Sequence, residues 1–105
     1  EALVMQLNVE SGTLLARLSG SLTIYDVAEL QTQLTEAGSM DQPMIVDLGG
    51  VTDIDTAGLQ WLIALRRSLG EQLALQNHSQ TVIELLDLYQ LAPFFGDVIV
   101  LSEHR

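Results

Sequence analysis

The chain has 105 residues and a formal net charge of −10, with four arginines, no lysine and no cysteine. That length fits a single domain over 1–105, and a hydrophobic content of 48 % supplies a packed core. Without a basic patch to neutralise phosphates, nucleic acid is excluded as a partner, and an anionic membrane surface would repel the chain. No apolar stretch approaches the ~20 residues of a membrane-spanning helix, so direct membrane insertion is not expected. The absence of cysteine excludes disulfides, thiolate nucleophiles and thiolate-bound zinc, and it fits a reducing, cytoplasmic compartment.

Two strands are expected at the start of the chain. Apolar and polar residues alternate over 3–9, which is typical of a half-buried strand with its odd-numbered residues inward. Glu10-Ser11-Gly12 then supplies a turn, and the alternation resumes over 14–18 until Gly20 ends the second strand. The two segments therefore predict a hairpin.

A first helix follows this hairpin. Thr23 is expected as its N-cap, with Asp26 as the capping-box partner. Val27, Leu30, Leu34 and Ala37 then recur at helical spacing. Gly38 is expected to end the helix.

The middle of the chain predicts a buried strand, a loop and a second helix. The continuous run Met44-Ile45-Val46, ending at Asp47-Leu48, suits a central strand covered on both faces. Gly49 to Thr56 is rich in Gly, Thr and Asp and is expected to be a loop. The helix that follows is expected to run to Gly70, with Arg66 and Arg67 in solvent. Its inward residues are expected to be Leu59, Leu62, Ile63 and Leu69.

The last third of the chain adds one more helix between two short strands. The strands are expected at Leu73-Ala74-Leu75 and from Val98 to Leu101. Ser79 is expected to cap the helix, whose apolar stripe carries Val82, Ile83, Leu86 and Tyr89, and Pro93 ends this helical region. The resulting order, β-β-α-β-α-β-α-β, predicts an α/β fold with a mixed, largely parallel sheet and three helices.

The segment Asp47–Leu59 carries the most information about function. It joins a buried strand to a helix, at the edge of a parallel sheet where binding sites preferentially lie. Asp55-Thr56-Ala57-Gly58 is a tetrapeptide found in GTPase switches, but the phosphate-binding loop of those enzymes needs a lysine that this chain lacks. The pair Asp53 and Asp55 also suggests a haloacid-dehalogenase-type phosphatase, which again needs a lysine. Both enzymatic interpretations are therefore disfavoured.

The same segment resembles the loop of the STAS domain family. That loop has the form Asp-Leu-Ser, a hydrophobic spacer, and then Asp-Ser-Ser/Thr/Ala-Gly-Leu at the start of a helix. Here the corresponding residues are Asp47-Leu48-Gly49 and, after the spacer, Asp55-Thr56-Ala57-Gly58-Leu59. Ser19–Thr23 resembles the family's Gly-Glu-Leu-Asp turn, and His78–Leu91 resembles its third helix, so the resemblance covers nearly the whole chain. Two departures are Thr23 in place of an acidic residue and Gly49 in place of Ser.

This resemblance implies a partner-switching signalling protein rather than an enzyme. In STAS members that antagonise anti-sigma factors, a partner kinase phosphorylates the hydroxyl that follows the loop aspartate, and the matching residue is Thr56. The implied partner is an anti-sigma factor kinase or a sensor kinase, with no metal and no cofactor. The implied partner-binding residues are Thr23, Asp53, Asp55, Thr56, Ala57, Gly58 and Trp61.

Structural roles remain open for several of these residues. Thr56 is equally suited to be a helix N-cap, and Asp53 and Asp55 suit a turn better than a metal pair. Gly58 suits close packing of a helix on the sheet. Trp61 suits either a partner anchor or burial against a neighbouring helix.

Two further roles stay open for the protein as a whole. The stretch from Leu22 to Tyr25 resembles STAS proteins that accompany chemotaxis histidine kinases. Leu88-Tyr89-Gln90-Leu91 and the Asp55 loop resemble the soluble STAS accessory subunit of the Mla-type phospholipid ABC transporter. That subunit binds a transporter ATPase and needs no phosphorylation.

Overall fold

The computed structural model describes residues 2–38 and 42–96 of the chain. Its strands are β1 (Val4–Glu10), β2 (Thr13–Leu22), β3 (Met44–Ile54) and β4 (Leu73–Gln76). Its helices are α1 (Val27–Glu36), α2 (Thr56–Leu69) and α3 (Gln80–Leu88), with the 3-10 turns η2 (Gly70–Gln72) and η3 (Pro93–Phe95). The predicted α/β class and element order are confirmed, while the strand predicted at Val98 to Leu101 lies outside the described residues.

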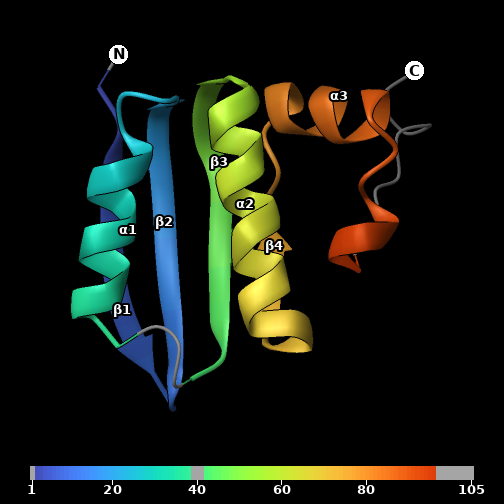
Figure 1. Cartoon of the computed structure of the whole chain (residues 1–105). Helices are drawn as coiled ribbons and strands as arrows, with labels where there is room; N and C mark the ends of the chain where they lie inside the picture. The colour runs from blue at the N-terminus through green and yellow to red at the C-terminus, as the bar shows by residue number, and fades with distance from the viewer. Residues whose placement is uncertain (1, 39–41, 97–105) are drawn as a thin grey trace.

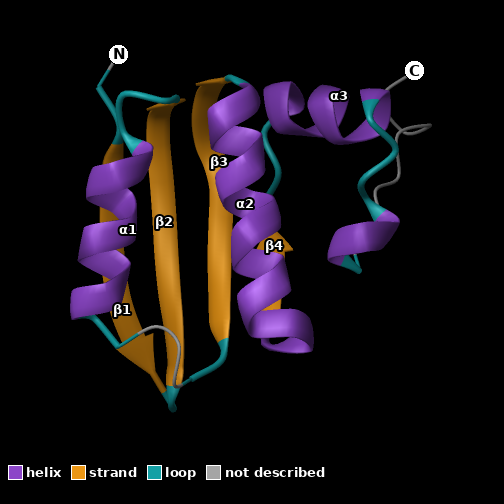
Figure 2. Cartoon of the chain, in the orientation of Figure 1, coloured by secondary structure: helices purple, strands orange, loops and turns teal. Residues whose placement is uncertain are grey.

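The four strands form one sheet in the order β1-β2-β3-β4. β1 runs antiparallel to β2, whereas β3 is parallel to both β2 and β4 (Figure 1). Helices α1 and α2 lie side by side over one face of this sheet (Figure 2). The hydrophobic core fills the space between the two layers, and it includes Leu18, Leu34, Val46 and Leu62, which are all fully buried. α3 packs against β3 instead, and its Thr81 hydroxyl donates to the carbonyl of Thr52 at 3.3 Å.

The opening hairpin forms as predicted, but its first strand is less covered than the alternation suggests. Ser11 and Gly12 form the two-residue turn, with φ values of 53° and 78° that match a type I′ hairpin. Leu7 and Val9 face the helix side, since they pair with the buried Ala16 and Leu14, yet they stay exposed. β1 is an edge strand, so these side chains have a neighbouring strand on one side only.

The predicted end of the second strand at Gly20 is wrong. β2 continues to Leu22, and Gly20 lies inside it with φ +98°. A side chain at this position would strike the carbonyl oxygen of Ala2, so the glycine allows the residues before β1 to pass close to β2. The pairing register between β2 and β3 also shifts between Gly20 and Ser21, which is why a glycine interrupts the strand pattern without ending the strand.

The predicted loop over Gly49 to Thr56 is also wrong, because β3 runs through it to Ile54. Gly50 lies against Ser19 of β2, where a Cβ atom would come within 2.6 Å of the serine Cβ. The glycines thus permit close approach across an irregular parallel pairing, instead of forming a loop. Only Asp55 separates β3 from α2.

Two surface assignments change with the tertiary structure. Arg66 does not extend into solvent: its guanidinium donates to the carbonyl oxygens of Phe94 at 2.9 Å, Gly70 at 2.6 Å and Leu73 at 3.2 Å. Arg67 is exposed as predicted. Tyr89 is not on the buried stripe of α3, since it follows the last residue of that helix and is exposed.

Candidate functional site

The carboxyl ends of β2 and β3 lie next to each other, where Leu22 pairs with Ile54. The chain leaves β2 through the turn that leads to α1, and it leaves β3 through Asp55 directly into α2 (Figure 1). The amide of Asp55 donates to the carbonyl of Leu22 at 3.3 Å, so the two exits are held in contact. The predicted site residues that follow both strands are therefore brought to one edge of the sheet.

Asp55 fixes the start of α2 and the turn beside it at the same time. It is the N-cap of α2, and its Oδ1 accepts the N–H of Gly58 at 2.9 Å. Its Oδ2 accepts the N–H of Ile24 at 3.0 Å, from the turn between β2 and α1. These backbone donors, Gly58 first and Ile24 second, hold the pKa of the Asp55 carboxyl below its ordinary value. Asp55 therefore remains ionised near neutral pH.

Thr56 is the first residue of α2 and its side chain is exposed. The alternative in which Thr56 caps the helix is wrong, because Asp55 makes that hydrogen bond. The Thr56 hydroxyl is thus left for another role, at a helix end where the backbone dipole favours negative charge.

Ala57 and Gly58 complete the first turn of α2 beneath this surface. Ala57 is half-buried and Gly58 is buried. A Cβ atom on Gly58 would collide with the carbonyl oxygen of Leu22, so only glycine lets α2 pack this closely on β2. The close-packing role predicted for Gly58 matches this geometry, and neither residue presents a large contact surface.

Thr23 lies in the turn next to Asp55, but it is not the N-cap of α1. The helix begins at Val27 with Asp26 as its N-cap residue. The Thr23 hydroxyl donates to the Asp26 carboxylate at 3.0 Å, and the Asp26 amide donates to the Thr23 carbonyl at 2.9 Å. The predicted pairing of the two side chains thus exists inside a tight turn that precedes the helix, which delays the helix start by three residues.

The same turn presents two apolar side chains that the sequence analysis did not assign to the site. Ile24 is 61 % exposed and Tyr25 is 93 % exposed. The hydrogen bond from the Ile24 amide to Asp55 ties them to the start of α2. An apolar pair just after a strand, in a turn where polar residues are usual, was the available signal.

Asp53 and Trp61 have different surroundings. Asp53 is exposed near the end of β3, and its Oδ1 accepts the N–H of Ile54 at 3.0 Å. Trp61 is only 7 % exposed, and its indole N–H donates to Gln31 of α1 at 3.2 Å. Of the two interpretations of Trp61, burial against a neighbouring helix is the one that this contact supports.

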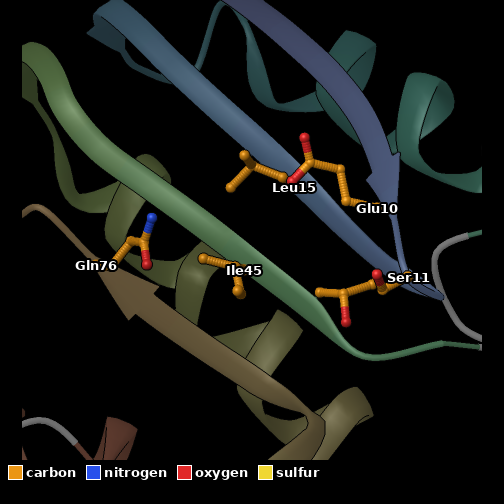
Figure 3. Close-up of a pocket in the computed structure, with 6 residues that line it drawn as sticks. Glu10, Ser11, Leu15, Ile45 and Gln76 are labelled. Carbon is orange, nitrogen blue, oxygen red and sulfur yellow. The ribbon is translucent and has the colours of Figure 1, made fainter.

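Other parts of the described structure show little that resembles a catalytic or metal centre. A hollow of about 410 Å³ lies between Glu10, Leu15, Ile45 and Gln76 near the hairpin end of the sheet (Figure 3). Within residues 2–38 and 42–96, no three His, Cys, Asp or Glu side chains are grouped to hold a metal ion. No helix in those ranges has the length and apolarity needed to cross a bilayer. The Phe94 and Phe95 rings meet edge to face at 5.1 Å, and Phe95 is buried.

The fold is similar to solved structures of anti-sigma factor antagonists. One from Mycobacterium paratuberculosis superposes with a TM-score of 0.77 at 17 % identity, covering 97 % of this chain and 90 % of the other. Unphosphorylated SpoIIAA gives 0.71 at 21 % identity, covering 96 % and 92 %. Phosphorylated SpoIIAA from Bacillus gives 0.67 at 21 % identity, covering 96 % of each chain. At these identities the likeness concerns the fold.

Sequence comparison gives a family assignment. A comparison with curated proteins gave no match. The family described as Mlab, STAS domain matches residues 5–100, which include the Asp55–Thr56 site and, apart from Val4 of β1, all strands and helices of the described residues. The chain therefore belongs to the family described as Mlab, STAS domain, and the predicted resemblance to STAS domains is confirmed.

Proposed function

We propose that this STAS domain is a non-enzymatic switch that binds an anti-sigma factor kinase or a sensor kinase through the surface around Thr56. We further propose that Thr56 is the hydroxyl that the partner phosphorylates. The observation that carries this proposal is the exposed Thr56 side chain at the first position of a 14-residue helix, directly after a capping aspartate. The existence of SpoIIAA structures in phosphorylated and unphosphorylated forms supports the same role for this fold.

The chemistry of this surface suits a charge-controlled contact. A phosphate on Thr56 adds about −1.5 to −2 charge units at pH 7. Asp53 and Asp55 both lie just before Thr56 in the chain, so the added charge raises local repulsion even though the helix dipole favours it. Ile24 and Tyr25 add exposed apolar area next to the hydroxyl. A partner that covers this surface would have to bury the new charge, which costs several kcal/mol when the charge is unpaired.

Variants at Thr56 test this proposal. Thr56→Glu is expected to fold normally and to bind the partner at least about tenfold more weakly, because it places an unpaired charge in the interface. Thr56→Ser should behave as the native chain does, and Thr56→Ala should still bind. The measurement is capture of the partner with the native chain, followed by titration of each variant against the identified protein. Ser68→Glu adds the same charge at an exposed position near the other end of α2 and serves as the matched control.

Two outcomes would contradict the proposal. Tight binding by Thr56→Glu would rule out charge switching at this site. If the captured protein is a kinase that leaves Thr56 unmodified when ATP is added, as measured by mass spectrometry, the phosphorylation step is ruled out.

We also expect no GTP or phosphomonoester hydrolysis above the level of an Asp55→Ala control.

A second candidate is an accessory subunit of a phospholipid ABC transporter, with a transporter ATPase as the partner. The observation that favours it is the description of the matching family as Mlab. This subunit would use the same surface without a phosphorylation step. Capture of an ATPase and a permease, whose binding depends on Thr56 but not on ATP-driven modification, would make this candidate the better one. Capture of a chemotaxis histidine kinase would instead favour a chemosensory role.

A further inference from the structure

β1 is an edge strand that lacks the usual features that prevent further strand pairing. No strand pairs with it among residues 2–38 and 42–96. All seven of its residues pair with β2 in an unbroken antiparallel register from Val4↔Ser19 to Glu10↔Thr13. It contains no lysine, no proline and no bulge, which are the features that usually block pairing at a sheet edge. Its only charged residue, Glu10, is at its end.

Hairpin geometry determines which backbone groups of β1 point outward. In a two-residue hairpin, the residues that flank the turn exchange hydrogen bonds, and the pairs then alternate. Glu10 and Thr13 flank the turn here, so the even-numbered residues of β1 bond to β2. The N–H and C=O groups of Met5, Leu7 and Val9 are therefore directed to the free edge.

The same three residues place their side chains on the helix side of the sheet. They pair with Leu18, Ala16 and Leu14, which are all buried there. Leu7 is 37 % exposed and Val9 is 56 % exposed, so apolar surface and free backbone groups coincide along this edge.

The charges beside this edge distinguish between possible occupants. Gln31 of α1 faces α2, where it bonds Trp61, so helical spacing turns Gln33 toward the β1 side. The side-chain amide of Gln33 donates to the carboxylate of the exposed Glu29 at 3.1 Å. Glu29 on that flank and Glu10 at the strand end give the edge a negative border. A second copy, with its own net charge of −10 and its own Glu29, would meet repulsion. An extended segment with alternating basic and apolar residues would meet complementary charge.

We propose that the β1 edge is a second binding surface, which accepts an extended, basic segment of a partner protein as an added strand. The main-chain groups of Met5, Leu7 and Val9 would bond the segment, in the β-augmentation mode of peptide recognition. Its apolar side chains would cover Leu7 and Val9 on the helix side, and its Lys or Arg side chains, on the opposite face of the sheet, would approach Glu10. This surface does not include Thr56, so the experiments below test it separately from the proposed switch.

A peptide probe tests the edge directly. The probe is an acetylated and amidated peptide of alternating Lys and Val, Lys-Val-Lys-Val-Lys-Val-Lys, added to the 15N-labelled chain. The control is the same composition as a block, Lys-Lys-Lys-Lys-Val-Val-Val, which keeps the charge and loses the alternation. Hydrogen exchange at the amides of Met5, Leu7 and Val9 is the readout. The alternating peptide is expected to slow exchange at these three amides at least about tenfold, whereas the block peptide is not.

Chain variants then separate strand addition from general attraction. Leu7→Pro removes one outward N–H without removing a bond to β2, a substitution that edge strands tolerate. It should abolish the protection at Met5 and Val9, and Glu10→Lys should weaken it. The control is Leu88→Lys, which changes an exposed leucine at the end of α3. It should leave the protection of Met5, Leu7 and Val9 unchanged.

Several results would overturn the proposal. One is equal protection by the two peptides, which would indicate charge attraction alone. Another is protection that survives Leu7→Pro. A third is protection in the peptide-free chain that disappears on dilution, which would identify the occupant as a second copy. Normal thermal melting of Leu7→Pro confirms that a loss of protection does not come from unfolding.

Discussion

Asp55 connects two segments through its two carboxylate oxygens. One oxygen caps α2 at Gly58 and the other holds the Ile24 amide, 31 residues away in the chain. Thr56 follows Asp55 directly, so its position relative to Ile24 and Tyr25 depends on this carboxylate. Asp55 is therefore a positioning residue for the surface that we propose as the switch.

The acid limb of the stability curve should report on Asp55. Its folded-state pKa lies below the ordinary value of 3.8, so the stabilisation is fully present above about pH 4 and is lost as pH falls through the folded pKa. Asp55→Asn keeps an acceptor for Gly58 but presents an N–H donor to the Ile24 amide, so it should be less stable than the native chain above pH 4. Urea unfolding at several pH values should show that this difference shrinks below pH 4. Asp87→Asn, an exposed aspartate in α3, is the control, and a difference that stays constant down to pH 2 would contradict the assignment.

The distance of α2 from the sheet is set where the helix begins. Gly58 contacts the carbonyl of Leu22, and Asp55 joins the helix to the adjacent turn. At its other end, Arg66 joins α2 to the start of β4 and to the segment around Phe94. The helix is thus held at both ends by contacts that its own amphipathic pattern does not reveal.

Gly58→Ala should shift α2 away from β2. The added methyl group would meet backbone rather than a flexible side chain, so we expect a loss of about 1–3 kcal/mol in the free energy of unfolding, despite the better helix propensity of alanine. Denaturant unfolding measures this loss. Gln60→Ala, on the exposed face of the same helix, should change stability by less than about 0.5 kcal/mol. A Gly58→Ala protein that is as stable as the native chain would show that the helix is not in contact with Leu22.

Arg66→Ala should loosen the end of α2 from β4 and η3. It removes a charged donor from three carbonyl oxygens, so we expect a destabilisation of about 1.5–3 kcal/mol. Arg66→Lys should recover only part of this, because one ammonium group cannot reproduce the guanidinium fork. Thermal unfolding compares them with Arg67→Ala, which changes an exposed arginine in the next position. Equal stabilities for Arg66→Ala and Arg67→Ala would contradict the role of Arg66.

The acidity of the whole molecule should govern how fast it finds a partner. With a net charge of −10 and no lysine, the chain is attracted to a basic surface over several ångströms of solvent, and salt screens that attraction. The association rate constant with the captured partner should fall about tenfold between about 0.05 and 0.5 M salt, while dissociation changes little. Asp53→Asn, near Thr56, should flatten this dependence more than Glu71→Gln at the far end of α2. A rate that does not depend on salt would exclude electrostatic steering.

The sequence by itself determined the element order and singled out the Asp55–Thr56 segment as the candidate site. Apolar periodicities of two and of about 3.6 residues are local properties, so they identified the hairpin, the three helices and the central strand without tertiary information. The Asp55–Leu59 segment carried the resemblance to the STAS family, which the family match confirms. The second helix was expected to begin after Thr56, whereas it begins at Thr56 because Asp55 caps it.

Only the tertiary structure decided where the strands end and what each site residue touches. Gly20, Gly49 and Gly50 favour turns locally, but close approach between chain segments makes them part of long strands. Three contacts join residues that are distant in sequence or on different elements. They are the hydrogen bond from Ile24 to Asp55, the bonds from Arg66 to backbone carbonyls, and the packing of Trp61 against α1. Such contacts depend on the packing of one element on another, which periodicity and propensity do not specify.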